Sequence, residues 1–77
     1  RSWRELRRHL AVLRDDDSGL ANDDVAICLR YAGTHAVAME RHRIGRLALE
    51  LAANQYRMLG RPEKAEDAVR MVRQLDA

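Results

Sequence analysis

The stretch Gly60-Arg61-Pro62-Glu63 decides the fold, because it separates two segments that each carry a helical pattern. Glycine suits the residue after a helix, proline suits the first turn of the next helix, and a glutamate there complements the helix dipole. Apolar residues recur on one side of each segment: Val37, Ile44, Leu47, Leu51 and Leu59 before the stretch, and Ala65, Ala68, Val69, Val72 and Leu75 after it. The sequence therefore predicts helices at 34–59 and 62–76, while Gly45 leaves open whether the first is continuous, bent or divided.

Small residues predict a close contact between these two helices. Ala53 and Ala65 would let the helices approach, and Tyr56 and Val69 would fill the space between them. From Arg46 to Ala77 the chain resembles one repeat of the tetratricopeptide (TPR) family, on Leu49, Ala52, Ala53, Tyr56, Gly60, Ala65, Val69, Val72 and the closing Gln74-Leu75-Asp76-Ala77. The resemblance implies a TPR-like antiparallel helical hairpin and a role in binding proteins.

The chain also departs from the TPR pattern. Leu49 stands where the family often has a large aromatic residue, Ala52 where a larger apolar residue is usual, and Ala77 where a closing proline is common. Such hairpins normally bury their faces by stacking several copies, and the only upstream similarity surrounds Gly33, 27 residues before Gly60. A plain antiparallel helical bundle therefore stays open as the alternative.

Two further helices are expected in the first half of the chain. Ser2 has the form of a capping-box residue and begins a predicted helix at 2–14, and Asn22 caps a predicted helix at 22–32. The acidic residues 15–17 followed by Ser18 and Gly19 indicate a polar loop between them, because carboxylates oppose the dipole at a helix C-terminus.

The predicted helix at 22–32 is apolar almost all round. A helix of this kind is expected to be buried, so we expect it to be the most buried element, with Cys28 in the core. Gly33 and Thr34 are expected to end this helix and to cap the next one.

Composition points to one all-α domain, a small bundle of about four helices spanning 1–77. The 77 residues are 47% hydrophobic and 4% aromatic, include no Phe, and contain only four Gly and one Pro. This palette suits helices, and turn-forming residues are too scarce for a fold of many strands. The chain begins at Arg1 without Met, so a fragment of a longer protein is also considered.

The charges and the single cysteine indicate the setting. A net charge of +2 from 14 basic and 12 acidic residues is the balance of a solvated surface. The excess of Arg over Lys follows from a GC-rich, bacterial genome or marks recognition of carboxylates or phosphates. One cysteine and the lack of a signal or long apolar run in this sequence predict a cytoplasmic protein with no membrane partner.

No cofactor, metal or enzymatic activity is expected. The residues His35, Met39 and His42 share one face of the predicted helix at 34–59, but they lack the carboxylate and histidine spacing of helical metal sites. The acidic loop has the wrong ligand order for calcium. The sequence shows no nucleophile-and-base pattern and no glycine-rich phosphate loop.

The function predicted from the sequence is that of a protein-interaction module, or small adaptor or regulatory domain, that binds a protein partner or a second copy of itself through a helical face. The candidate partner-binding residues are Trp3, Leu6, Leu10, Arg41, Arg43, Arg46 and Tyr56.

The alternative is a DNA- or RNA-binding regulator. Residues 22–49 can be drawn as a helix-turn-helix with its turn at Gly33-Thr34 and with Arg41, His42, Arg43 and Arg46 facing phosphates or base edges. Residues 36–44 also resemble, over a short stretch, the RNA-binding helices of bacterial antiterminators.

Overall fold

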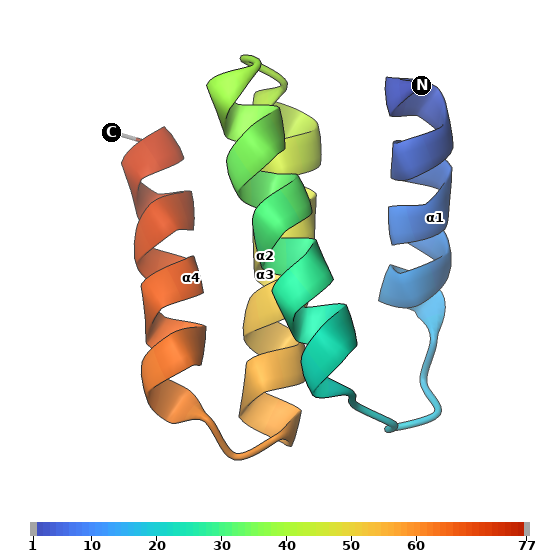
Figure 1. Cartoon of the computed structure of the whole chain (residues 1–77), viewed down its shortest axis with the longest axis vertical. Helices are drawn as coiled ribbons and strands as arrows, with labels where there is room; N and C mark the ends of the chain where they lie inside the picture. The colour runs from blue at the N-terminus through green and yellow to red at the C-terminus, as the bar shows by residue number, and fades with distance from the viewer. Residues whose placement is uncertain (1, 77) are drawn as a thin grey trace.

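The computed structural model describes residues 2–76, and within this range the chain forms four helices and no strand. The helices are α1 (Trp3–Asp15), α2 (Asp23–Ala38), α3 (His42–Met58) and α4 (Pro62–Leu75). Helix α3 lies at the centre: α2 crosses in front of it, and α1 and α4 flank it on opposite sides (Figure 1). The prediction of a small all-α bundle ending in a helical hairpin is confirmed.

The predicted starts of the first, second and last helices are confirmed by their caps. The Ser2 hydroxyl oxygen accepts hydrogen bonds from the backbone amides of Arg4 and Glu5 at 3.1 and 3.3 Å. The side chain of Asn22 accepts from the amides of Asp24 and Val25 in the same way. Pro62 occupies the first turn of α4, where its missing N–H leaves no bond unmade.

The predicted boundary at Gly33-Thr34 is wrong. Helix α2 runs through both residues to Ala38, so the predicted helices 22–32 and 34–59 are replaced by α2 and α3. Gly33 is buried inside α2, and the Thr34 hydroxyl donates to the carbonyl oxygen of Arg30 at 2.8 Å, a bond made within the helix.

The true boundary lies at Met39-Glu40-Arg41, and it repeats the geometry of the α3–α4 turn. The Arg41 amide donates to the Ala36 carbonyl oxygen at 2.7 Å, and the Arg61 amide donates to that of Tyr56 at 2.8 Å. Glu40 and Gly60 hold the left-handed position of these Schellman turns, with φ of 62° and 73°. Because the α2–α3 turn has a glutamate at this position, it lacks the glycine that usually marks a helix end in a sequence.

The two internal glycines serve the crossing of α2 over α3. A Cβ atom on Gly45 would lie 2.6 Å from Cγ2 of Val37 and 3.2 Å from the carbonyl oxygen of Gly33. A Cβ atom on Gly33 would lie 2.7 Å from Cγ of Leu49. Gly45 therefore neither bends nor divides α3, and its missing side chain allows the two backbones to approach.

Helix α3, and not α2, is the most buried element. Its buried residues are Gly45, Ala48, Leu49, Leu51, Ala52, Ala53 and Tyr56. On α2, by contrast, Ile27 and Tyr31 are 44% and 71% exposed, and Cys28 is exposed. The expectation that 22–32 is buried on all sides, with Cys28 in the core, is therefore wrong.

Candidate interaction surface

A groove runs between α1 and α2, because α1 packs mainly against α3. Leu10 anchors α1 in the core and is only 2% exposed. The groove has two neighbouring hollows of about 370 and 410 Å³, and Leu6 and His9 line both of them. From Trp3 to Leu13 the groove follows α1 for about 15 Å, or roughly three helical turns.

The floor of the first hollow is apolar. Besides Leu6 and His9, it is lined by Leu10, Leu13, Asp24, Val25, Cys28, Leu29 and Ala32. Asp24 stands at one end of this set, in the first turn of α2. An apolar floor with a polar residue at its end is the arrangement that commonly receives an apolar side chain from a partner.

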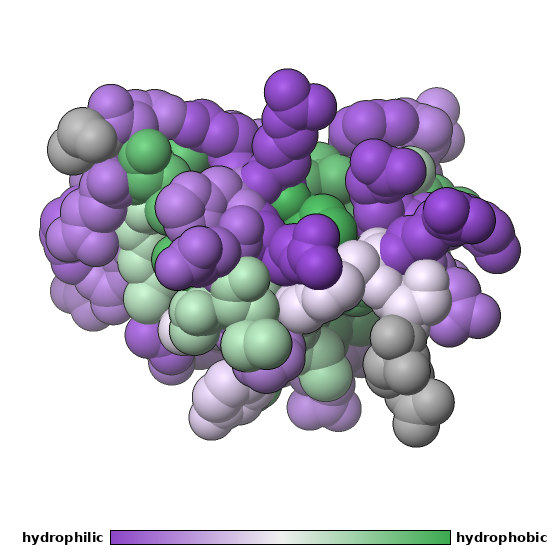
Figure 2. Space-filling model, turned by 90° about the horizontal axis from the view of Figure 1, so that it is seen from above, coloured by the Kyte–Doolittle hydropathy of each residue, from purple (hydrophilic) through white to green (hydrophobic). Residues whose placement is uncertain are grey.

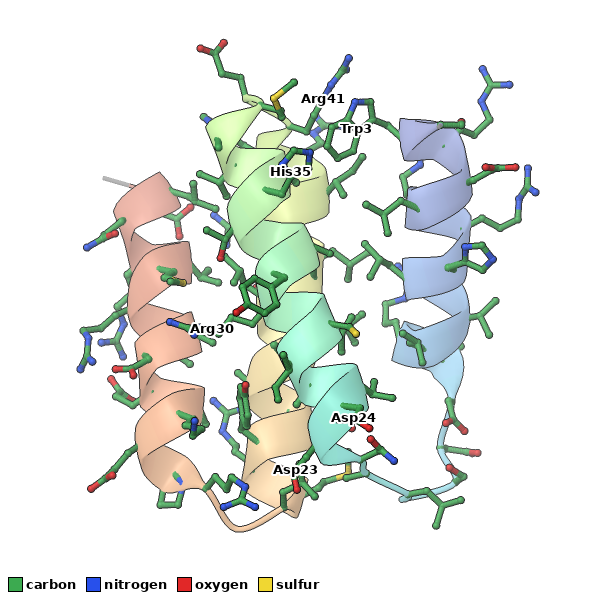
Figure 3. All side chains as sticks on the ribbon, viewed as in Figure 1. Trp3, Asp23, Asp24, Arg30, His35 and Arg41 are labelled. Carbon is green, nitrogen blue, oxygen red and sulfur yellow. The ribbon has the colours of Figure 1, made fainter. Side chains whose placement is uncertain are left out.

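Trp3, His35 and Arg41 close the other end of the groove. The rings of Trp3 and His35 stack, with centroids 5.8 Å apart and planes at 21°, and Cζ of Arg41 lies 5.7 Å from the centre of the indole (Figure 3). The three residues come from α1, from α2 and from the α2–α3 turn. This stack links the N-terminal end of α1 to α2 and to the α2–α3 turn. A cation over an indole ring contributes about 0.5–1 kcal/mol of stability at an exposed site.

An exposed apolar ridge lies beside the groove on α2. Ile27 and Tyr31 are four residues apart and therefore neighbours on the helix surface, and Met39, 55% exposed, follows at the end of α2. Cys28 lies between the ridge and the groove. Contiguous exposed apolar patches often belong to interaction sites, so this ridge is a candidate one.

The outer side of α4 has the opposite character. Its exposed residues include Glu63, Glu66, Asp67, Arg70 and Arg73, and they form the ion pairs Arg70–Asp67 and Arg73–Glu66. A helix with a charged outer face of this kind ends a bundle by facing water. The two flanks of α3 therefore differ, and the α1–α2 side is the apolar one.

Polar contacts hold the start of α2 against the second half of the chain. The guanidinium of Arg61 donates to both carboxylate oxygens of Asp23, at 2.9 and 3.2 Å, and the Asn22 amide donates to the side-chain oxygen of Gln55 at 3.1 Å. The hydrogen bond from Arg61 lowers the pKa of Asp23. These contacts tie the N-terminal end of α2, which forms one wall of the groove, to α3 and the α3–α4 turn.

The structure brings some of the predicted partner-binding residues together and separates others. Trp3 and Leu6 are half-buried and line the groove, and Arg41 covers Trp3. Leu10 and Tyr56, at 2% and 3% exposure, belong to the core of the chain itself.

The two remaining arginines lie on α3, away from the groove lining. Arg43 is exposed, whereas Arg46 pairs with Glu50 at 3.7 Å and with Asp76 beyond the end of α4. Viewed from the end that carries the α2–α3 turn, the surface is mostly hydrophilic, with a band of weakly hydrophobic colour across it (Figure 2).

Ile27, Cys28 and Tyr31 are the surface residues that sequence reasoning missed. The segment looked buried because apolar residues lie on all its faces, and sequence alone does not reveal that α1 packs on α3 and leaves α2 open. One signal of an exposed face was available in the sequence: Ile27, Tyr31 and His35 are spaced four residues apart, and Asp24 lies one turn before Cys28.

The expected alignment of His35, Met39 and His42 on one helix is wrong, because the first lies in α2 and the last in α3. Across residues 2–76 no group of three His, Cys, Asp or Glu side chains is placed to hold a metal ion. In the acidic loop the Asp16 carboxylate accepts hydrogen bonds from the amide and hydroxyl of Ser18. Nor does any helix within these residues have the length and hydropathy to cross a membrane.

Comparison of the chain with protein-family models, with curated proteins and with solved structures finds no match. The TPR resemblance therefore stays a prediction, and the functional argument rests on the geometry of the α1–α2 side.

Proposed function

We propose that this chain is a protein-interaction module that binds its partner through the groove between α1 and α2 and the ridge of Ile27 and Tyr31. The observation that carries the proposal is the contrast between the two flanks of the bundle. One flank has an apolar groove beside exposed apolar side chains, and the other is a charged helix. Apolar contact area of this kind is a common basis of helix-in-groove binding between proteins.

The α3–α4 hairpin supplies the scaffold in this proposal. Ala53 and Ala65 are buried at 2% and 3% exposure, and Tyr56 is buried beside them in the core cluster, as the TPR resemblance leads one to expect. The module acts without catalysis, as an adaptor or regulatory domain in a reducing, cytoplasmic setting, which suits the exposed thiol of Cys28.

The test is a comparison of the proteins that an immobilised chain retains from a cell extract. The variant Ile27→Asp with Tyr31→Asp places two charges on the ridge and is expected to lose the retained protein, because charges are unfavourable at the apolar centre of an interface. Circular dichroism of the variant checks that its helices remain. Equal retention by the wild-type chain and by this variant would refute the proposal.

Arg43→Ala with Arg46→Ala is the matched control, since both residues are on α3 and outside the groove lining. It is expected to retain the partner. The same pair of substitutions addresses the nucleic-acid alternative, whose turn at Gly33-Thr34 is not present in the structure. Binding to DNA or RNA that weakens steeply with salt and is lost in the arginine variant would favour that alternative.

A further inference from the structure

The α1–α2 side has opposite charges at its two ends. The α1–α2 loop and the start of α2 form an acidic end, and the α2–α3 turn lies at the other end of the molecule, as Figure 1 shows. The acidic end comprises Asp15, Asp16, Asp17, Asp23 and Asp24, of which Asp15 pairs with Arg14 and Asp23 with Arg61. The opposite end, here called the basic end, carries Arg4 and Arg41 together with His35, against the carboxylates of Glu5 and Glu40, while Arg43 and His42 belong to the start of α3.

On the face itself this polarity is concentrated in few residues. Asp24 lines the groove at the acidic end, and His35 with Arg41 stands at the basic end (Figure 3). Asp24 and His35 are eleven residues apart on α2, or about 16 Å along the helix. None of the ion pairs formed within residues 2–76 involves Asp24 or Arg41.

We propose that the occupant of this face is a second copy of the chain, with the two α2 helices antiparallel about a twofold axis. This inference rests on the proposed function and names its partner. A twofold axis midway between Asp24 and His35 places Asp24 level with the partner's His35, and it does so twice; the partner's Arg41 lies just beyond, in the turn that follows α2. The same axis brings Cys28 opposite the partner's Tyr31, because both pairs share one midpoint on α2.

A second copy fits this face better than a partner of uniform charge. A basic helix would match only the acidic end, and an acidic helix only the basic end, whereas an antiparallel copy complements both ends together. Because the twofold axis is perpendicular to both α2 helices, the ridge of one copy lies beside the ridge of the other and the groove beside the groove, so that the apolar residues of the two copies cover one another. A stable dimer needs about 800 Å² from each copy, which is roughly one-seventh of the 5621 Å² surface of this chain.

The test exchanges the charges between two variants of the full chain. Asp24→Arg and Arg41→Glu each place like charges at both ends of the dimer, so each variant alone is expected to dissociate at least about tenfold more readily than the wild-type chain. In an equimolar mixture the two variants can pair with each other. The introduced Arg at position 24 then pairs with the introduced Glu at position 41, and the native Asp24 of the Arg41→Glu chain pairs with the native Arg41 of the Asp24→Arg chain. The mixture is therefore expected to recover the dimer in sedimentation equilibrium.

Glu63→Arg is the matched control, because it also reverses an acidic residue in the first turn of a helix, but on the outer side of α4. It is expected to leave the association unchanged, and circular dichroism checks the helix content of every variant. A short reagent with two thiol-reactive ends gives an independent reading, since Cys28 is the only cysteine and is expected to cross-link two wild-type chains.

A wild-type chain that stays monomeric at about 1 mM, or a mixture that does not recover association, would overturn the pairing. Failure of the pairing is distinguishable from failure of the proposed function. If the chain is monomeric but still retains a protein that the Ile27 and Tyr31 variant loses, only the identity of the occupant is wrong.

Discussion

Substituting Gly45 with alanine tests the close crossing of α2 and α3. Two effects oppose each other at this site. Alanine favours a helix interior by about 1 kcal/mol over glycine. Its methyl group, however, would lie 2.6 Å from Cγ2 of Val37, 3.2 Å from the carbonyl oxygen of Gly33 and 3.3 Å from the amide nitrogen of Val37.

The contacts with backbone atoms decide the sign. Val37 can rotate its methyl group away, but the two backbone atoms move only if α2 and α3 separate, and α3 is the most buried helix. Overpacking of this kind costs about 1–3 kcal/mol, so the net loss of stability is about 1 kcal/mol. For a domain of this size that loss lowers Tm by about 4–8 °C.

Thermal unfolding followed by circular dichroism measures the change. Thr34→Ala is the control, because position 34 lies on the same crossing helix but is exposed, so only the helix propensity of alanine acts there, and it is expected to leave Tm unchanged or to raise it slightly. A Gly45→Ala variant with an unchanged or higher Tm would refute the crossing as described, since only the helix-propensity gain would then be acting.

Three further predictions concern stability. Ala65→Leu is expected to cost about 1–3 kcal/mol, because position 65 is 3% exposed, and a urea midpoint equal to that of the wild-type chain would contradict its place in the core. Glu40→Gly is expected to stabilise the fold by about 1 kcal/mol by relieving a φ of 62°, and a loss of stability would contradict the turn geometry. Since Arg61 lowers the pKa of Asp23, its ion pair contributes stability above the ordinary carboxyl pKa of about 3.9, and the contribution is lost as the pH falls through the folded pKa. Asp23→Asn is therefore expected to flatten the decline of the urea midpoint below about pH 4, and an identical decline in both chains would count against the pair.

Much of the fold could be predicted from the sequence, because its local signals agree with the packing. Ser2 and Asn22 cap the helices they were expected to cap, and the Gly60-Arg61-Pro62 turn separates the last two helices. Ala53 and Ala65 are buried as small contact residues. In each case a local chemical requirement and the tertiary arrangement favour the same residue.

The second boundary could not be predicted, because glycine has two uses that look alike in sequence. At position 60 it supplies a positive φ, whereas at positions 33 and 45 it supplies space between two helices. The real turn carries Glu40 in the left-handed conformation, which Schellman hydrogen bonds stabilise. The alignment of 36–41 with 56–61, twenty residues apart, becomes visible only once the two turns are compared.

The candidate surface was only partly predictable for a related reason. The groove does bring together Trp3, Leu6 and Arg41. Leu10 and Tyr56, by contrast, are buried in the core of the chain itself. Apolar periodicity shows which side of a helix is covered by something, and it does not distinguish the chain's own core from a partner. That distinction depends on which helix α1 packs against, which is a tertiary property.

The most direct test of the account is the dilution of an isotope-labelled chain, followed by amide nuclear magnetic resonance. Association through the α1–α2 side predicts that the signals of Ile27, Cys28 and Tyr31 shift as the concentration falls, while those of α4 stay in place. Shifts centred on α4, or no shift at any residue between about 1 mM and 10 μM, would contradict association through this face.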